Sequence, residues 1–130
     1  MRVNGFSLIE VLVVIGVITL VNLILLPNFT SLMSVTKAIS AKSTTRNVMV
    51  AIEQFYFLNQ AYPNTLQIST VLAELKSAEI ISELPTNPFT GLAYSDSDAS
   101  GRLSYRYVST DEYQLQLYGQ NNEQIILTYP

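Results

Sequence analysis

The side chain near the amino terminus with the clearest capacity for chemistry is the carboxylate of Glu10. It is the only charged group in the 21 residues 6–26, which are otherwise almost entirely apolar. A carboxylate on a lipid-facing helix costs on the order of 3 kcal/mol on insertion scales, and less near an interface. Such a group either reaches the headgroup layer or pairs with a cation, so Glu10 is the first candidate functional residue.

The apolar run around Glu10 has the length of a membrane span. At about 1.5 Å of rise per residue it extends roughly 31 Å as a helix, close to the thickness of the hydrocarbon core. A cleavable secretory signal needs a shorter apolar core that ends at a small-residue site, whereas Pro27 follows this run. A plain signal anchor fits the length but does not explain Glu10. We therefore expect residues 6–27 to form a transmembrane helix.

Residues 5–11, GFSLIEV, stand behind a short leader in which Arg2 is the only charge. This run closely resembles the processing motif of type IV prepilins and type II secretion pseudopilins. The resemblance implies that a prepilin peptidase cleaves after Gly5 and that the new amine of Phe6 is N-methylated. It also implies that Glu10 pairs with the Phe6 amine of a neighbouring subunit during filament assembly.

The residue types agree with that chemistry. Gly5 has no side chain to obstruct a peptidase cleft, and cleavage would create a cation that neutralises Glu10 in an apolar setting. Phe6 and Glu10 are also four residues apart on one helix face, so pairing within a single chain is compatible with the spacing as well.

The helix that carries Glu10 is expected to continue for roughly fifty residues. Pro27 lacks a donor for the carbonyl of Leu23, which predicts a helix kink there rather than a stop. A proline at this place resembles the family, in which it is associated with local melting of the helix; a simple bend at the membrane edge is the alternative. Residues 41–47 are polar and expected to be exposed on most sides. Val48, Ile52 and Phe55 are expected to be buried. They belong to an apolar stripe that comprises Phe29, Leu32, Met33, Ile39, Val48, Ile52, Phe55 and Leu58.

The remainder of the chain predicts a small domain. Residues 59–64 contain Asn and Pro and end the long helix. Thr70 is expected to cap a short helix that runs to Ile81, with Val71, Leu72, Leu75 and Ala78 on its inner face. Residues 87–91, NPFTG, are typical of a turn and resemble a loop of pseudopilin-like domains. Strands are predicted at 103–108, 113–118 and 124–129, with turns at 110–112 and 119–123.

These elements predict an α+β fold that resembles a type IV pilin. A long N-terminal helix, with a membrane half and an amphipathic half, packs through residues 48–58 on a small C-terminal antiparallel sheet. The expected organisation is a leader peptide at 1–5, a transmembrane and assembly segment at 6–27, and a globular domain at 28–130.

Composition excludes several classes of function. The 130 residues contain no Cys and no His, which removes disulfides, thiolate and Ser-His nucleophiles, and the usual zinc ligands. A net charge of −3 with dispersed basic residues does not predict nucleic-acid binding. No Gly-rich phosphate loop is present, so we do not expect an enzyme.

One loop is suggestive of a metal. Asp96, Asp98 and Ser100 place oxygen ligands on alternate residues before Gly101, which resembles the opening of a calcium loop. The twelfth position holds Tyr107 where an EF-hand has Glu. Major pseudopilins, which this chain resembles, lack a disulfide and hold calcium in C-terminal loops. No cofactor is expected if this is an ordinary solvated loop, which is the favoured interpretation; calcium is the alternative.

The sequence therefore predicts a structural subunit of a helical type IV pilus-like filament. Its expected partners are further copies of itself, a prepilin peptidase, the inner-membrane assembly machinery and the membrane before assembly. The expected location is the inner membrane, as a single-pass protein with its C-terminal domain outside the cytoplasm, and then a periplasmic or extracellular filament. The alternative is an uncleaved membrane-anchored domain whose small sheet binds a ligand or calcium.

Overall fold

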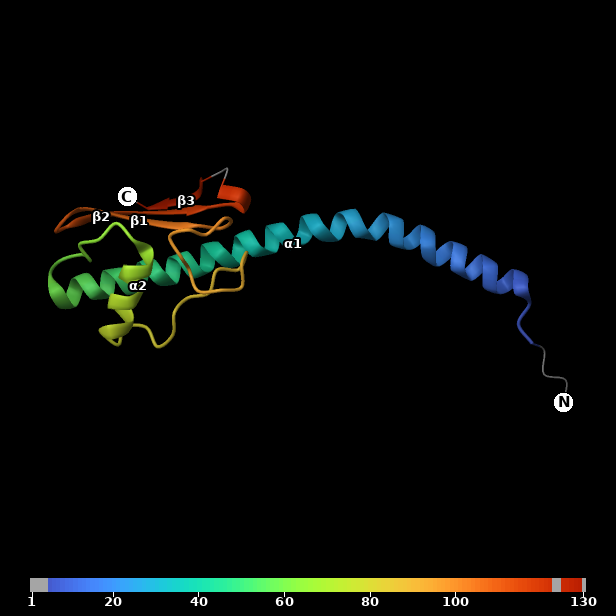
Figure 1. Ribbon diagram of the computed structural model, residues 1–130, viewed down its shortest axis with the longest axis horizontal. Coiled ribbons are helices and arrows are strands. Elements are labelled where there is room, and N and C mark those ends of the chain that lie inside the picture. Colours follow the sequence, from blue (N-terminus) through green and yellow to red (C-terminus); the bar gives the residue numbers. More distant parts are fainter. Residues whose placement is uncertain (1–4, 123–124, 130) are drawn as a thin grey trace. The chain divides into compact units, whose positions relative to one another are not determined.

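The computed structural model describes residues 5–122 and 125–129, without the side chains at 26–28 (Figure 1). It confirms the α+β class: one long helix, apolar at its N-terminal end, packs on a three-stranded antiparallel sheet. The elements, in chain order, are α1 (Leu8–Asn59), α2 (Ile68–Ser77), β1 (Leu103–Ser109), β2 (Glu112–Tyr118), the 3-10 helix η1 (Gln120–Asn122) and β3 (Ile125–Tyr129).

Helix α1 is 52 residues long, as the unbroken helical pattern predicts. Its residues belong to two compact units, the first ending at Val35 and the second comprising Thr36–Pro130. In the first unit every described side chain from position 5 to 25 is exposed, although most are apolar. An apolar helix surface of this extent requires lipid or other protein around it.

Within the second unit, α1 buries a narrow stripe. Ala41, Thr45, Val48 and Ile52 recur every three or four residues and are inaccessible or nearly so. Thr45 can be buried because its hydroxyl donates to the carbonyl of Ala41 at 2.8 Å.

Part of the predicted stripe is therefore wrong. Ala41 and Thr45 lie in the core, although residues 41–47 were expected to be mostly exposed. Phe55, which was expected to be buried, is half-buried, and five other members of the stripe are exposed: Phe29, Leu32, Met33, Ile39 and Leu58. The buried stripe thus includes the small residue Ala41 and the polar residue Thr45, and not every large apolar residue of the helical pattern.

The sheet has the order β1-β2-β3, with both neighbouring pairs antiparallel. Leu103 faces Leu117 and Tyr105 faces Leu115 across β1 and β2, so these buried side chains share one face. That face lies against α1, as Figure 1 shows. The three predicted strands are confirmed to within one residue, except that position 124 lies outside the described residues.

Helix α2 differs from its prediction at both ends. It begins at Ile68 rather than at a cap formed by Thr70, and it ends at Ser77 rather than Ile81. The start is earlier because the carboxylate of Asp96, far along the chain, accepts the N–H of Ile68 at 2.7 Å. The helix stops because Glu79 adopts φ 57°, and Ala78 is exposed instead of facing inward.

Tyrosine side chains connect the C-terminal end of α1 to the sheet through ring contacts and hydrogen bonds. The ring of Tyr62 lies 4.5 Å from that of Tyr56 and 4.6 Å from that of Tyr113, between ring centroids. Tyr62 and Tyr113 both donate their hydroxyls to the carboxylate of Glu53, each at 3.0 Å. Burial, together with the neighbouring Glu53 carboxylate, raises the pKa of Tyr62 to about 12, so its hydroxyl stays protonated and donating.

Candidate functional site

The junction between Gly5 and Phe6 lies just before α1, outside any helix or strand. Residues 5–7 are exposed and non-helical. A Cβ added at Gly5 would meet nothing within 4 Å, and the backbone there does not adopt a positive φ. The fold therefore makes no demand for glycine at this position, and the peptide bond after Gly5 is open to solvent.

Glu10 lies in the first turn of α1 and holds the start of the helix. Its Oε2 accepts the backbone N–H of Ser7 at 2.9 Å, while the carbonyl of Ser7 accepts the N–H of Glu10 at 3.0 Å. This is the acidic half of a capping box, in which a Glu three residues after Ser satisfies a free backbone donor. The signal, Ser-x-x-Glu before an apolar run, is in the sequence, and sequence reasoning missed it.

Phe6 and Glu10 lie on the same side of the chain. Together with Ile9, Val13 and Val14 they border one open hollow of about 320 Å³. The Phe6 side chain is 81% exposed, so this ring is free to contact lipid or another protein. The structure thus brings together two of the residues that the motif singles out.

Helix α1 continues through position 27, where a kink is predicted. The Pro27 side chain lies outside the described residues, so the kink stays a prediction.

The loop that suggested calcium uses its oxygens within the fold. Asp96 accepts the N–H of Ile68 and the hydroxyl of Ser69 at the start of α2. Asp98 accepts the side-chain amide of Asn87 at 2.9 Å.

The hydroxyl of Ser100 has a different partner, because it accepts the N–H of Asn121 at 3.0 Å. Within residues 5–122 and 125–129 no group of three or more His, Cys, Asp or Glu side chains is placed to hold a metal ion. The side-chain oxygens of Asp96, Asp98 and Ser100, which were predicted to bind calcium, therefore each accept hydrogen bonds from different residues in this structure.

Asn87 organises the NPFTG turn and the loop beside it. Its buried side chain donates to Asp98 and to the carbonyl of Ser100, both at 2.9 Å, and accepts the N–H of Phe89 at 3.0 Å. Gly101 closes the same cluster with φ 65°, and a Cβ there would lie 2.8 Å from Oδ1 of Asn87. The predicted turn at 87–91 is confirmed, with Gly91 donating to the carbonyl of Asn87 at 2.8 Å.

Calcium binding by Asp96 and Asp98 remains a prediction, and the contacts above sharpen its test. Calcium has to compete with the start of α2 for Asp96, so binding is expected to be weak and to need millimolar concentrations. We expect calcium to raise the melting temperature of the full chain in detergent, because it binds the folded state alone. The doubly substituted variant Asp96→Asn with Asp98→Asn should lose that shift. Superimposable melts of the wild-type chain in calcium and in chelator would leave an ordinary hydrogen-bonded loop.

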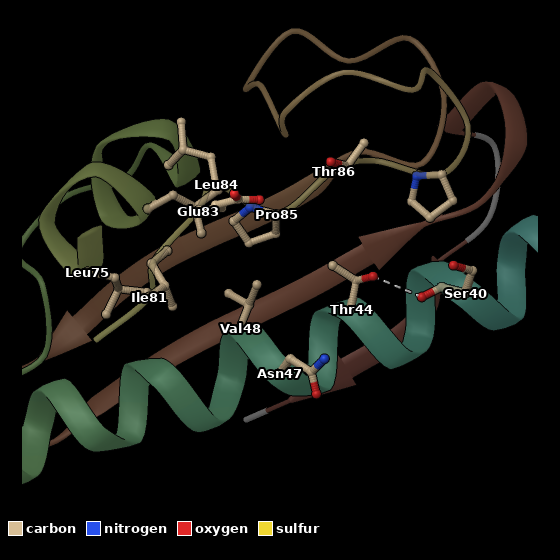
Figure 2. Close-up of a pocket in the computed structure, with 12 residues that line it drawn as sticks. Ser40, Thr44, Asn47, Val48, Leu75, Ile81, Glu83, Leu84, Pro85 and Thr86 are labelled. Atoms are coloured by element: carbon tan, nitrogen blue, oxygen red, sulfur yellow. Dashed lines mark hydrogen bonds between the residues drawn. The ribbon is translucent and has the colours of Figure 1, made fainter. Parts of the chain in front are cut away.

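A larger hollow of about 560 Å³ lies in the second unit, between α1, α2 and the segment 81–88 (Figure 2). Val48, Leu75 and Ile81 supply apolar lining, and Glu83 is the only ionisable lining residue. Figure 2 also shows Thr44, whose hydroxyl donates to the carbonyl of Ser40 at 3.1 Å. The lining offers packing surface and hydrogen-bonding groups.

Comparisons of the chain with protein-family models, with curated proteins and with solved structures find no match. By length and composition α1 is able to cross a membrane, although an N-terminal signal sequence meets the same criterion. The architecture is pilin-like: an apolar helix near the N-terminus continues into a helix that packs on a small antiparallel sheet.

Proposed function

We propose that the chain is a structural subunit of a helical type IV pilus-like filament, either a type IV pilus or a type II secretion pseudopilus. A prepilin peptidase cleaves it after Gly5, the amine of Phe6 is methylated, and the inner-membrane machinery assembles the product. The observation that carries the proposal is the position of Glu10, a carboxylate at the start of an apolar helical segment whose side chains are exposed at positions 5–25, next to an accessible Gly-Phe junction.

The exposed apolar segment supports assembly through this helix. Its side chains need an apolar environment, which lipid provides before assembly and the helices of other copies provide afterwards. The same surface thus serves both the membrane-bound precursor and the filament, and no rearrangement of the second unit is required.

Electrostatics connects the proposed cleavage to Glu10, because cleavage creates a cation that can neutralise its carboxylate. Residues 6–26 contain no basic side chain, so the amine created at Phe6 is the cation available to Glu10 within the apolar segment. That amine would lie at the positive end of the helix dipole, where a cation is disfavoured. A carboxylate from the same or a neighbouring chain offsets both the dipole and the apolar surroundings.

The alternative is an uncleaved membrane-anchored domain outside the cytoplasm, whose small sheet binds a ligand or calcium. The hydrogen bond from Ser7 to Glu10 favours it, because that bond gives the carboxylate a role without a partner chain. In that case Glu10 only caps α1, Gly5 has no role in processing, and Phe6 has no free amine because its nitrogen stays in a peptide bond.

Replacement of Gly5 by Val distinguishes the filament subunit from the uncleaved anchored domain. We expect Gly5→Val to abolish removal of residues 1–5, because a branched side chain blocks the peptidase cleft while the fold tolerates it. Intact-mass measurement of membrane-extracted protein reports the cleavage.

Gly16→Val is the matched control. A Cβ at Gly16 also meets nothing within 4 Å, and that residue lies within the span, away from the junction. Removal of residues 1–5 from both variants to the same extent would contradict the assignment of Gly5.

A further inference from the structure

The sheet carries a polar hollow on the face turned away from α1. In β2, Leu115 and Leu117 are buried and belong to the core cluster that also contains Val48 and Ile52 of α1. Because successive side chains of a strand point to opposite faces, the residues that alternate with these leucines face the other way. The hollow on that side has a volume of about 250 Å³ and is lined by Ser104, Arg106, Gln114, Gln116 and Tyr118. We call these five residues the sheet hollow.

The strand register brings the polar side chains of the sheet hollow together. Arg106 lies opposite Gln114, and Ser104 lies opposite Gln116, across β1 and β2. Side chains in such positions have Cβ atoms about 4.5 to 5.5 Å apart. Tyr118 donates its hydroxyl to Oε1 of Gln116 at 3.3 Å. The sheet hollow is therefore one continuous patch of hydroxyl, amide and guanidinium groups.

Much of the hydrogen-bonding capacity of this patch is not used by the fold. Within residues 5–122 and 125–129, the side chains of Ser104, Arg106 and Gln114 make no hydrogen bond or ion pair with other residues. Arg106 is also exposed. Its planar fork of N–H donors is thus available to a ligand.

Positive charge exceeds negative charge on this side of the sheet, but the charges are sparse. Arg102 brings a second guanidinium, whose Cζ lies 4.6 Å from the centroid of the Tyr118 ring. Arg102 and Arg106 are four residues apart, which is about 13 Å in extended chain. Glu112 is exposed and lies two residues before Gln114 on the same side of β2. Two separated cations with one carboxylate at the edge favour a ligand that has few, widely spaced negative charges.

We propose that the sheet hollow binds an acidic polysaccharide, with Arg106 holding a sugar carboxylate. The guanidinium fork matches the two oxygens of a carboxylate. The amides of Gln114 and Gln116 and the hydroxyl of Ser104 both donate and accept hydrogen bonds, as sugar hydroxyls do. The volume is below the roughly 300 Å³ at which pockets for drug-sized ligands begin, so the hollow takes one sugar unit. Neighbouring units of the polymer lie along the sheet towards Arg102.

A single-stranded nucleic acid is the competing polyanion, and the sheet hollow suits it less well. Such ligands need a basic groove along the phosphate backbone and open aromatic faces on which bases stack. Tyr118 is the aromatic residue of the hollow, and the guanidinium of Arg102 occupies one face of its ring. The net charge of −3 also disfavours a densely charged polyanion.

The binding of a sugar polymer goes beyond the proposed function, because it involves none of the residues at the Gly5-Phe6 junction. Titration calorimetry of the full chain in a non-ionic detergent measures it without requiring cleavage or assembly. A failure to bind therefore leaves the proposed function untouched, and a failure to assemble leaves the binding proposal untouched.

The probe is a hexamer of galacturonic acid, and the matched ligand is the same hexamer with every carboxylate methyl-esterified. We expect the acidic hexamer to bind at micromolar to millimolar concentration. The ester should bind at least about tenfold more weakly, because it loses the charge-assisted hydrogen bonds to Arg106. A single-stranded DNA hexamer serves as the third ligand and should bind more weakly than the acidic sugar.

Substitutions locate the site on the sheet. Arg106→Gln should weaken binding of the acidic hexamer at least about tenfold, and Arg106→Lys should be intermediate because it keeps the charge without the fork. Arg46→Gln is the matched control, since it removes the same charge from an exposed position on α1 and should bind like the wild type. Arg106 is exposed, so its variants should melt within a few degrees of the wild type.

Three results would overturn the proposal. The first is an acidic hexamer that does not bind at millimolar concentration or binds no better than its ester. The second is tighter binding of the DNA hexamer, which would assign the hollow to nucleic acid. The third is an equal loss of binding in Arg46→Gln and Arg106→Gln, which would show general attraction to positive charge rather than a site.

Discussion

Glu10→Gln is expected to reduce filament yield at least 100-fold while leaving membrane insertion and removal of residues 1–5 intact. Gln retains a carbonyl that can accept the N–H of Ser7, so the start of α1 is preserved. What is lost is the charge, and an unpaired ammonium in apolar surroundings costs several kcal/mol. Since each 1.4 kcal/mol is about a tenfold change in equilibrium, assembly should collapse. Immunoblots of sheared filaments measure the filament yield, and immunoblots of membrane fractions measure the amount of inserted and processed protein.

Two companion substitutions separate charge from capping. Glu10→Asp keeps the charge on a shorter side chain and should retain more assembly than Glu10→Gln. Glu10→Ala removes both the charge and the cap. If Glu10→Gln assembles like the wild type and only Glu10→Ala fails, the carboxylate serves to cap α1 and the filament role of its charge is wrong.

Ile52→Asp is expected to unfold the second unit. Ile52 is 0% exposed and belongs to the core cluster that includes Leu115 and Tyr105 of the sheet. A carboxylate there loses the apolar contacts, at a cost of about 2 to 5 kcal/mol, and is buried without a partner, at a cost of about 3 to 5 kcal/mol more. Small domains are stable by only about 5 to 15 kcal/mol, so little or no folded population should remain at physiological temperature. The near-ultraviolet circular dichroism of the tyrosines, followed through a thermal melt in detergent, reports the loss.

Val50→Asp is the matched control two residues away on the same helix. Because Val50 is exposed, its replacement should leave the melt within a few degrees of the wild type. A wild-type melt for Ile52→Asp would show that α1 does not pack on the sheet.

The elements that follow local rules were predictable from the sequence. An unbroken helical pattern predicts α1 to the point where Asn59 ends it, and alternation in residues 113–118 predicts the central strand. Both signals depend only on neighbouring residues, so no knowledge of the rest of the fold is needed.

The features that depend on distant residues were not predictable. Helix α2 begins at Ile68 because Asp96, 28 positions later, accepts its N–H. Thr45 is buried beside Tyr94, which lies 49 positions later in the chain, although its residue type suggests exposure. Asp96 and Asp98 look like a metal loop because capping and metal binding both require exposed oxygens, and only the fold shows where those oxygens point.

The N-terminal site also has one part that was predictable from neighbouring residues and one part that was not. Gly5, Phe6 and Glu10 are identified by a contiguous motif, so the sequence alone singles them out. Their proposed chemistry requires a cut peptide bond and a second copy, neither of which belongs to a single intact chain. The capping role of Glu10 was visible in the spacing to Ser7 and becomes evident once the hydrogen bond is seen.

The most direct test of the proposal is the intact mass of the wild-type chain extracted from membranes. We predict the mass of a chain that begins at Phe6 and carries one added methyl group, with fragmentation placing that methyl on the amine of Phe6. A mass that still includes residues 1–5 in the membrane-bound and assembled protein would contradict the filament account and favour the uncleaved anchored domain.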